Sequence, residues 1–147
     1  FDDMLNTNTK STFFLNRYVY QNMNEGGSIV NISSINATNP AGGLTHYGTS
    51  KAAVEMLTKC LAMEFGPKVR VNCIAPGLIY KKGQEQRIPG WTESYKERSP
   101  LHSLVYGEDI GNTAITLSSD LSRAITGQIV TVDCGIMLTP CFDNSRH

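Results

Sequence analysis

The amino-acid sequence predicts an α/β fold in which helices cover both faces of a doubly wound parallel sheet. Helical and strand-like segments alternate along the chain, and the strand-like segments are short, apolar and rich in β-branched residues. Both features are typical of parallel βαβ units with right-handed crossovers. The 147 residues contain no internal repeat or linker, and the three strands they predict are fewer than such a sheet normally holds. We therefore expect residues 1–147 to form one incomplete domain, the C-terminal portion of a doubly wound fold.

The first predicted elements are a helix and a strand. Apolar side chains recur at helical spacing after Phe13, which indicates a helix over residues 3–24. The glycines of EGG (residues 25–27) end this helix, because glycine readily adopts the left-handed cap. The sequence SIVNIS (residues 28–33) then predicts a short strand that is buried on both faces. A loop rich in Ser, Asn, Pro and Gly follows it.

A long second helix and a second strand come next. The helix is predicted from Thr45 to Phe65, where the sequence GPK ends it. Its core-facing stripe is expected to consist of Ala53, Met56, Leu57, Cys60 and Leu61. The sequence VRVNCIA (residues 69–75) predicts a second buried strand, and a Pro-Gly pair ends it.

Residues 78–100 are the least patterned and most charged part of the chain. A segment of this length without periodicity inside a compact domain is usually functional or mobile. A shorter helix is predicted over residues 107–119, followed by a third strand over residues 126–133. Periodicity is lost from residue 135 onward.

Composition limits the classes of partner and site. The 13 basic and 13 acidic residues balance, so no basic field indicates a nucleic acid or a membrane surface. The apolar runs are too short to cross a bilayer, and no charged-then-apolar leader opens the sequence. The four cysteines form no C-x-x-C pair and have no histidine at metal-ligand spacing, so no metal site is expected. We expect a protein of the reducing cytoplasm.

Tyr47 and Lys51 lie one helical turn apart near the start of the second helix. Their spacing places both side chains on one helix face, with the phenol and the ammonium within reach of each other. Such a pair is either a surface coincidence or a tuned proton donor. A nearby ammonium favours the ionised form of a phenol, which suits acid–base work on a carbonyl or alcohol oxygen.

Other polar features are expected to meet Tyr47 at one edge of the sheet. Ligands of open parallel sheets bind beyond the carboxyl ends of the strands. The first strand ends at Ser33 and Ser34, the second ends at Pro76 and Gly77, and Tyr47 opens the helix between these strands. The sequence has neither a G-x-S-x-G nucleophile elbow nor a Walker loop. A hydroxyl, a phenol and an ammonium remain as the chemistry of this edge.

The motifs around these residues resemble those of the short-chain dehydrogenase/reductase family. The sequence SSINATNPAGGLTHYGTSK is similar to the family's Ser-x12-Tyr-x3-Lys signature, which aligns Ser34, Tyr47 and Lys51. The sequence NTKSTF (residues 8–13) resembles the helix segment that carries the family's fourth catalytic residue. The sequence VRVNCIAPGLI (residues 69–79) resembles the strand that ends in Pro-Gly under the nicotinamide. The resemblance implies a Rossmann-like fold and NAD(P)-dependent oxidoreductase activity, as in 3-oxoacyl carrier-protein reductases and hydroxysteroid dehydrogenases.

The resemblance implies a role for each matching residue. Tyr47 would exchange a proton with the substrate oxygen, and Lys51 would favour ionisation of that phenol and bind the nicotinamide ribose. Ser34 would orient and polarise the carbonyl. Asn8 would hold a water that links Lys51 to solvent. The nicotinamide would also be bordered by Pro76, Gly77 and Ile79.

Residues 78–100 correspond to the family's substrate loop, which commonly closes over bound ligands. Their mixture of charged and apolar side chains leaves open a 3-oxoacyl carrier thioester, a sugar or polyol, or a steroid-like alcohol. Lys81 stands where the family often places a threonine that contacts the nicotinamide side. Trp91 is either an anchor that fixes the loop to the protein or an aromatic wall for the substrate.

The family's glycine-rich phosphate turn does not occur within residues 1–147. The choice between NAD and NADP therefore stays open, and we expect this segment alone to hold a dinucleotide weakly. The resemblance further implies a homodimer or homotetramer, with the helices over residues 3–24 and 45–65 packed between subunits. A non-catalytic relative that acts as a binding or assembly element is the alternative.

Overall fold

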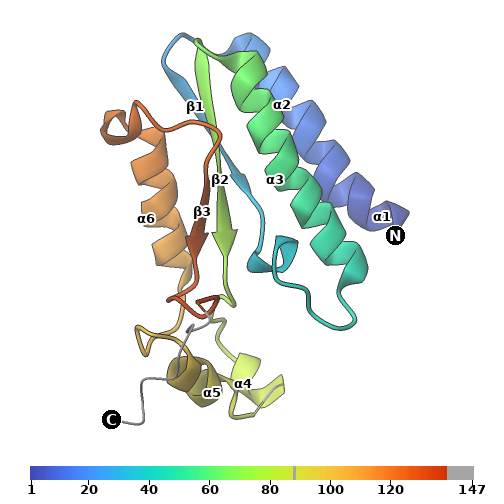
Figure 1. The fold of residues 1–147 in the computed structure, drawn as a ribbon, viewed down its shortest axis with the longest axis vertical. Coiled ribbons are helices and arrows are strands. Elements are labelled where there is room, and N and C mark those ends of the chain that lie inside the picture. Colours follow the sequence, from blue (N-terminus) through green and yellow to red (C-terminus); the bar gives the residue numbers. More distant parts are fainter. Residues whose placement is uncertain (88, 139–147) are drawn as a thin grey trace.

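The sheet lies at the centre of the fold. The computed structural model describes residues 1–87 and 89–138, and its three strands are β1 (Gly27–Ile32), β2 (Val69–Pro76) and β3 (Ile129–Val132). They are parallel and lie in the order β1-β2-β3, with Ile32 opposite Ile74 and Pro76 opposite Val132 (Figure 1). The two registers bring the carboxyl ends of all three strands to the same edge of the sheet.

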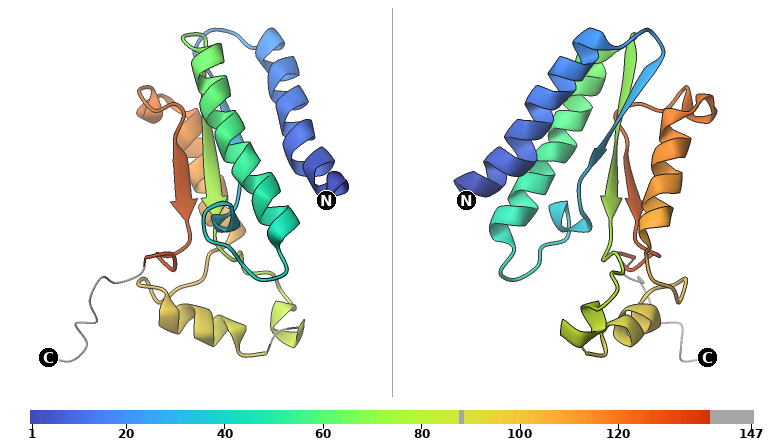
Figure 2. Two further views of the ribbon diagram at one scale, coloured as in Figure 1. Left: turned by 45° about the vertical axis from the view of Figure 1, so that its right-hand side comes forward. Right: turned by 180° about the vertical axis from the view of Figure 1, so that it is seen from behind.

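Helices cover both faces of the sheet. α2 (Ser11–Asn22) and α3 (Thr45–Phe65) lie side by side on one face, and α6 (Gly107–Ser118) lies on the other (Figures 1 and 2). α3 connects β1 to β2, and α6 lies on the path from β2 to β3. The predicted α/β class with helices on both faces of a parallel sheet is confirmed, as are the predicted bounds of α3.

The first helical segment is less regular than predicted. α1 (Asp2–Met4) leads into a π-helical segment, Leu5–Lys10, and then into α2, so the helix spans residues 2–22 rather than 3–24. The π-helical turns place two neighbouring side chains against α3: Asn8 Nδ2 donates to Ser50 Oγ at 2.9 Å, and Thr9 Oγ1 donates to the Ser50 carbonyl at 3.1 Å. Apolar periodicity does not report such a local widening, which often occurs at functional sites.

The core forms where the C-terminal half of α3 packs on β2. Its buried cluster consists of Leu61, Ala62, Phe65, Val69 and Val71. The ring of Tyr20, from α2, stacks on Phe65 with 4.0 Å between the ring centroids. β2 is the central strand and is buried as predicted.

The core stripe predicted for α3 is only partly correct, because Leu61 is buried while Ala53 and Leu57 are half-buried. Met56 and Cys60 are exposed, and the neighbouring Met63 is 87% exposed. The buried stripe is instead Ser50, Val54, Glu55, Thr58, Leu61, Ala62 and Phe65. The prediction followed apolar residues, whereas the helix turns polar side chains toward β1.

These polar side chains form a buried chain of hydrogen bonds. Asn16 Nδ2 of α2 donates to Asn31 Oδ1 at 2.9 Å, and Asn31 Nδ2 donates to Thr58 Oγ1 of α3 at 3.0 Å. Pairing compensates the burial of most of these polar atoms, whereas Asn16 Oδ1 has no partner among the described residues. The chain ties both helices to β1 just ahead of its carboxyl end.

β1 is less buried than predicted. Ile32 is 44% exposed, and only Asn31 of this strand is buried. Within residues 1–87 and 89–138, β1 has a hydrogen-bonded neighbour on one side only, which is β2. The prediction of a strand buried on both faces is therefore wrong for the described chain.

The segment over residues 78–100 is more ordered than its sequence indicated. It forms α4 (Gln84–Arg87) and α5 (Trp91–Arg98), with Trp91 and Tyr95 buried against Leu104 and Tyr80. Trp91 therefore matches the loop-anchor alternative rather than an aromatic wall of the cavity. Tyr95 Oη donates to the Asp133 carbonyl at 2.8 Å, and burial raises the pKa of this phenol to about 12.

The remaining predictions differ in their bounds. α6 ends at Ser118 rather than at residue 119, and β3 covers residues 129–132 rather than 126–133. Cys141 and most of the unpatterned tail lie outside the described residues. The described helices include none that is long and apolar enough to cross a bilayer.

Candidate active site

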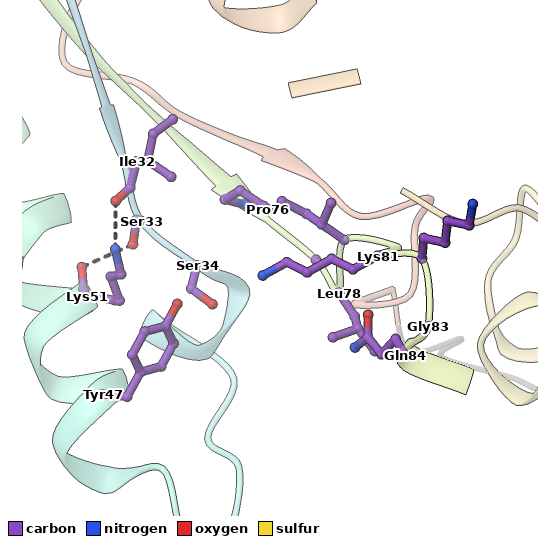
Figure 3. Close-up of a pocket in the computed structure, with 13 residues that line it drawn as sticks. Ile32, Ser33, Ser34, Tyr47, Lys51, Pro76, Leu78, Lys81, Gly83 and Gln84 are labelled. Atoms are coloured by element: carbon purple, nitrogen blue, oxygen red, sulfur yellow. Dashed lines mark hydrogen bonds between the residues drawn. The ribbon is translucent and has the colours of Figure 1, made fainter. Parts of the chain in front are cut away.

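A cavity of about 730 Å³ opens beyond the carboxyl ends of β1 and β2 (Figure 3). Its walls are the end of β1, the first turns of α3 and the segment from Pro76 to Gln84. The cavity brings together six of the seven predicted site residues, namely Ser34, Tyr47, Lys51, Pro76, Gly77 and Ile79. The rule that ligands bind at the carboxyl edge of a parallel sheet thus locates a real cavity.

Ser33 and Ser34 follow one another at the end of β1 but have different partners. Ser33 Oγ lies 3.0 Å from the Lys51 carbonyl and 3.0 Å from Glu55 Oε1, so its proton is directed into the protein. Ser34 Oγ accepts from the Asn36 backbone N–H at 3.2 Å. Among the described residues, the Ser34 hydroxyl proton has no acceptor. The structure therefore makes Ser34 the serine that can donate to a ligand.

Lys51 is held against the end of β1. Its ammonium donates to the Ile32 carbonyl at 3.0 Å, which leaves two N–H groups for other acceptors. Burial lowers the pKa of Lys51 below its usual value, and the nearby Cys73 thiol acts in the opposite direction. The same burial raises the pKa of Cys73 to about 11, so this thiol stays protonated near neutrality.

Tyr47 and Lys51 share a helix face, as their spacing predicts. The Lys51 ammonium lies 5.7 Å from the centroid of the Tyr47 ring. In Figure 3 the Tyr47 hydroxyl is directed toward Ser34, across the mouth of the cavity. A phenol, a free hydroxyl and an ammonium therefore converge on one space, and this set suits proton exchange with a ligand oxygen.

Asn8 lies outside this cavity. Its amide donates to Ser50 Oγ, and Ser50 Oγ in turn donates to the Tyr47 carbonyl at 2.7 Å. Asn8 thus stabilises, through Ser50, the helical turn that carries Tyr47 and Lys51. Its predicted water-holding role remains a prediction.

The structure adds to the site one buried carboxylate and two polar lining residues that the sequence motifs did not indicate. Glu55 is a buried carboxylate that fixes Ser33, and its position one turn after Lys51 on the same helix face could have signalled this. Lys82 and Gln84 line the cavity beside Lys81, in a segment whose sequence gives no periodicity. No group of three or more potential metal ligands occurs in the described part of the chain.

Comparison with known proteins gives the same family from sequence and from structure. The sequence profile of the family described as enoyl-(acyl carrier protein) reductase matches residues 1–137. Carbonyl reductase [NADPH] 2 of Sus scrofa is 36% identical over 143 residues, covering 93% of this chain and 59% of the relative. The 3-oxoacyl-[acyl-carrier-protein] reductase of Thermotoga maritima is 34% identical over 140 residues, covering 93% of this chain and 57% of the relative.

Solved structures share the fold. A short-chain type dehydrogenase/reductase from Mycobacterium ulcerans superposes with a TM-score of 0.82 at 35% identity, covering 90% of this chain and 50% of that protein. A 4-hydroxyisoleucine dehydrogenase complexed with NADH gives a TM-score of 0.82 at 30% identity, covering 90% of this chain and 57% of that protein. The chain spans about half the length of the relatives it matches. It belongs to the short-chain dehydrogenase/reductase family.

Proposed function

We propose that the protein carrying this chain is an NAD(P)-dependent oxidoreductase that interconverts a ketone and a secondary alcohol. The observation that carries the proposal is the convergence of Ser34, Tyr47 and Lys51 on one cavity at the carboxyl edge of the sheet. One relative is named for NADPH, and one similar structure is a complex with NADH, so the relatives support either cofactor. A cytoplasmic location remains a prediction.

The cavity suits the nicotinamide end of such a cofactor. The two free N–H groups of Lys51 would bind the ribose hydroxyls, since its third is used by Ile32. The nicotinamide would be bordered by Pro76, Gly77 and Ile79. When bound, the nicotinamide supplies a hydride to the substrate carbon or accepts one from it.

Side chains of the protein transfer the proton that accompanies the hydride. Ser34 donates a hydrogen bond to the substrate oxygen, which fixes the carbonyl and stabilises the negative charge that develops on it. In the reductive direction, Tyr47 transfers its phenolic proton to that oxygen, so the phenol O–H bond breaks and the alcohol O–H bond forms. The nearby Lys51 ammonium stabilises the resulting phenolate, which regains its proton from solvent. Oxidation follows the reverse path.

Cofactor binding tests this proposal. The full-length protein is titrated with NADH and with NADPH while the nicotinamide fluorescence is followed. We expect saturable binding of at least one of the two, because the cavity offers donors and an apolar wall for the nicotinamide end. If neither binds, the oxidoreductase proposal is wrong, and the alternative of a non-catalytic binding or assembly element takes its place.

We also propose that the protein assembles as a homodimer or homotetramer through the helices over residues 3–24 and 45–65. α2 exposes Phe14 and Leu15, and α3 exposes Met56 and Met63. Large apolar side chains grouped on adjacent helices are typical of subunit interfaces. The expected partner is a second copy of the same pair of helices.

The replacement Met56→Glu tests this assembly. A carboxylate placed in an apolar interface loses hydration without a partner, so we expect the oligomer to dissociate toward monomer. Sedimentation velocity on the full-length protein measures the change. The control Arg123→Glu changes an exposed residue away from both helices and should leave the oligomer intact. An unchanged sedimentation coefficient in Met56→Glu would exclude this helix face from the interface.

A further inference from the structure

Among the residues that the structure describes, the cavity is lined by three lysines and by no acidic side chain. Lys51 lies on α3, while Lys81 and Lys82 come from the turn between Ile79 and α4. Glu85, at the start of α4, does not line the cavity, and its carboxylate accepts from the Gly90 N–H at 2.6 Å and from Thr92 Oγ1 at 2.9 Å. The described walls of the cavity thus carry three positive charges and no negative one, and the buried Glu55 carboxylate lies behind Ser33.

Two of the three ammonium groups are available to a ligand. Lys51 is committed in part, since it donates to the Ile32 carbonyl. Lys81 and Lys82 are exposed, and neither has a carboxylate within ion-pair distance in the described part of the chain. A flexible ammonium without a partner is free to pair with an anion that enters the cavity.

Lys81 is directed toward the side of the cavity where the reacting oxygen would be held. Figure 3 shows its side chain extending from the turn toward Ser34 and the Tyr47 hydroxyl. A substrate oxygen held by these two hydroxyls would lie between α3 and the Lys81 ammonium. Because the Lys81 ammonium is positive, this placement favours a substrate that carries a negative charge close to its carbonyl.

We propose that the substrate is a ketone or secondary alcohol with a negatively charged group, a carboxylate or a phosphate, near the reacting carbon. This inference rests on the proposed oxidoreductase function. Lys81 pairs with the anionic group, and Lys82 adds to the attractive potential at the cavity mouth. Of the substrate classes that the sequence left open, neutral polyols and steroid-like alcohols make no use of this charge.

Kinetics of the full-length protein with a matched pair of ketones test the proposal. The pair is 4-oxopentanoate and its methyl ester, which differ in charge but not in the reacting carbonyl. A second pair, dihydroxyacetone phosphate and dihydroxyacetone, distinguishes phosphate from carboxylate. Lys81→Gln should raise the KM for the preferred anionic ketone by about tenfold and leave the neutral partner unchanged, as expected for loss of a charge-assisted contact. Lys81→Arg should retain the preference, and Lys96→Gln, at an exposed lysine outside the cavity, should match the wild type.

The cofactor phosphates are the competing source of anion. If Lys81→Gln weakens NADH or NADPH binding and slows charged and neutral ketones equally, Lys81 contacts the cofactor and the substrate proposal is wrong. If no ketone responds to the replacement, the proposal is also wrong.

A readout without turnover separates this inference from the proposed function. Acetylation of lysine amines is measured by mass spectrometry with and without 4-oxopentanoate and dihydroxyacetone phosphate. We expect one of these anions to protect Lys81 relative to Lys96. Equal labelling of both lysines overturns the inference even if the protein binds NAD(P). Protection without cofactor binding overturns the oxidoreductase proposal and leaves Lys81 as part of a site for anions.

Discussion

Replacement of Tyr47 by phenylalanine is expected to lower kcat by about 10²–10⁴-fold, the range that general acid–base catalysis contributes. The change removes one oxygen and keeps the ring, so the first turn of α3 and the contact with the Lys51 ammonium remain in place. Ser34 and Lys51 still bind their ligands, but no group delivers a proton to the substrate oxygen. Steady-state kinetics of the full-length protein with NADH or NADPH measure the loss.

Cofactor affinity separates this explanation from a structural one. The dissociation constant of the reduced cofactor should stay close to that of the wild type, because Lys51 and the Pro76–Ile79 wall are unchanged. The control Tyr18→Phe removes the same oxygen from a tyrosine that is 68% exposed on α2, and its kcat should be unaffected. A Tyr47→Phe enzyme with a near-normal kcat would show that the proton follows another route.

The candidate site was predictable because it depends on local spacing and on topology. A tyrosine and a lysine four positions apart must share a helix face, whatever the helix packs against. The ends of β1 and β2 must meet at one edge, because a helical crossover makes the strands parallel. These two rules locate Ser34, Tyr47, Lys51 and Gly77 without knowledge of any side-chain contact.

Features that depend on tertiary partners were not predictable in this way. The sequence pattern assigned Met56 and Cys60 of α3 to the core, but the stripe that faces the sheet contains Glu55 and Thr58. Their hydrogen bonds, to Ser33 just after β1 and to Asn31 within it, compensate their burial. Nothing local distinguishes Ser33 from Ser34 either. Their difference arises because Glu55 approaches one of them and not the other.

The positive charge of the cavity is a second feature that depends on tertiary structure and was not predictable from the sequence. Lys81 and Lys82 belong to a segment without periodicity, and the residue before them, Tyr80, packs against Trp91 and Tyr95 of α5. The family resemblance leads us to expect a threonine at residue 81, but only the fold shows that the Lys81 ammonium shares a cavity with Tyr47 and Lys51.

Gly77 links the stability of the fold to the shape of the cavity. It follows the last residue of β2, and its N–H donates to the Val132 carbonyl of β3 at 2.9 Å. A Cβ at this position would lie 2.6 Å from Tyr95 Oη, 2.9 Å from Asp133 Cβ and 3.0 Å from Asp133 Cα. Glycine is therefore required for close approach rather than for an unusual backbone angle.

The surroundings of Gly77 have little freedom to move away. The Asp133 carboxylate accepts from the Gly135 N–H at 2.8 Å and from the Met137 N–H at 3.0 Å, which fixes the turn after β3. Tyr95 donates to the Asp133 carbonyl and so fixes α5 to the same turn. A methyl group at residue 77 must separate β2 from this turn, and that movement carries the cavity wall with it.

We expect Gly77→Ala to lower the free energy of unfolding by about 1–3 kcal/mol, the usual cost of overpacking. It should also lower kcat/KM by about tenfold or more, because displacements of about 1 Å at a reacting centre cost up to about 10²-fold. Urea unfolding and steady-state kinetics of the full-length protein measure the two effects. They should appear together, since one displacement causes both.

Gly111→Ala provides the matched control. A Cβ on this glycine of α6 would meet no atom within 4 Å, so alanine should raise stability by about 0.5–1 kcal/mol through helix propensity and leave kcat/KM unchanged. If Gly77→Ala unfolds at the same urea concentration as the wild type but still loses activity, the added methyl obstructs the ligand directly. In that case the turn after β3 moves to accommodate the methyl group without loss of stability. The prediction that one displacement lowers both stability and activity is then wrong.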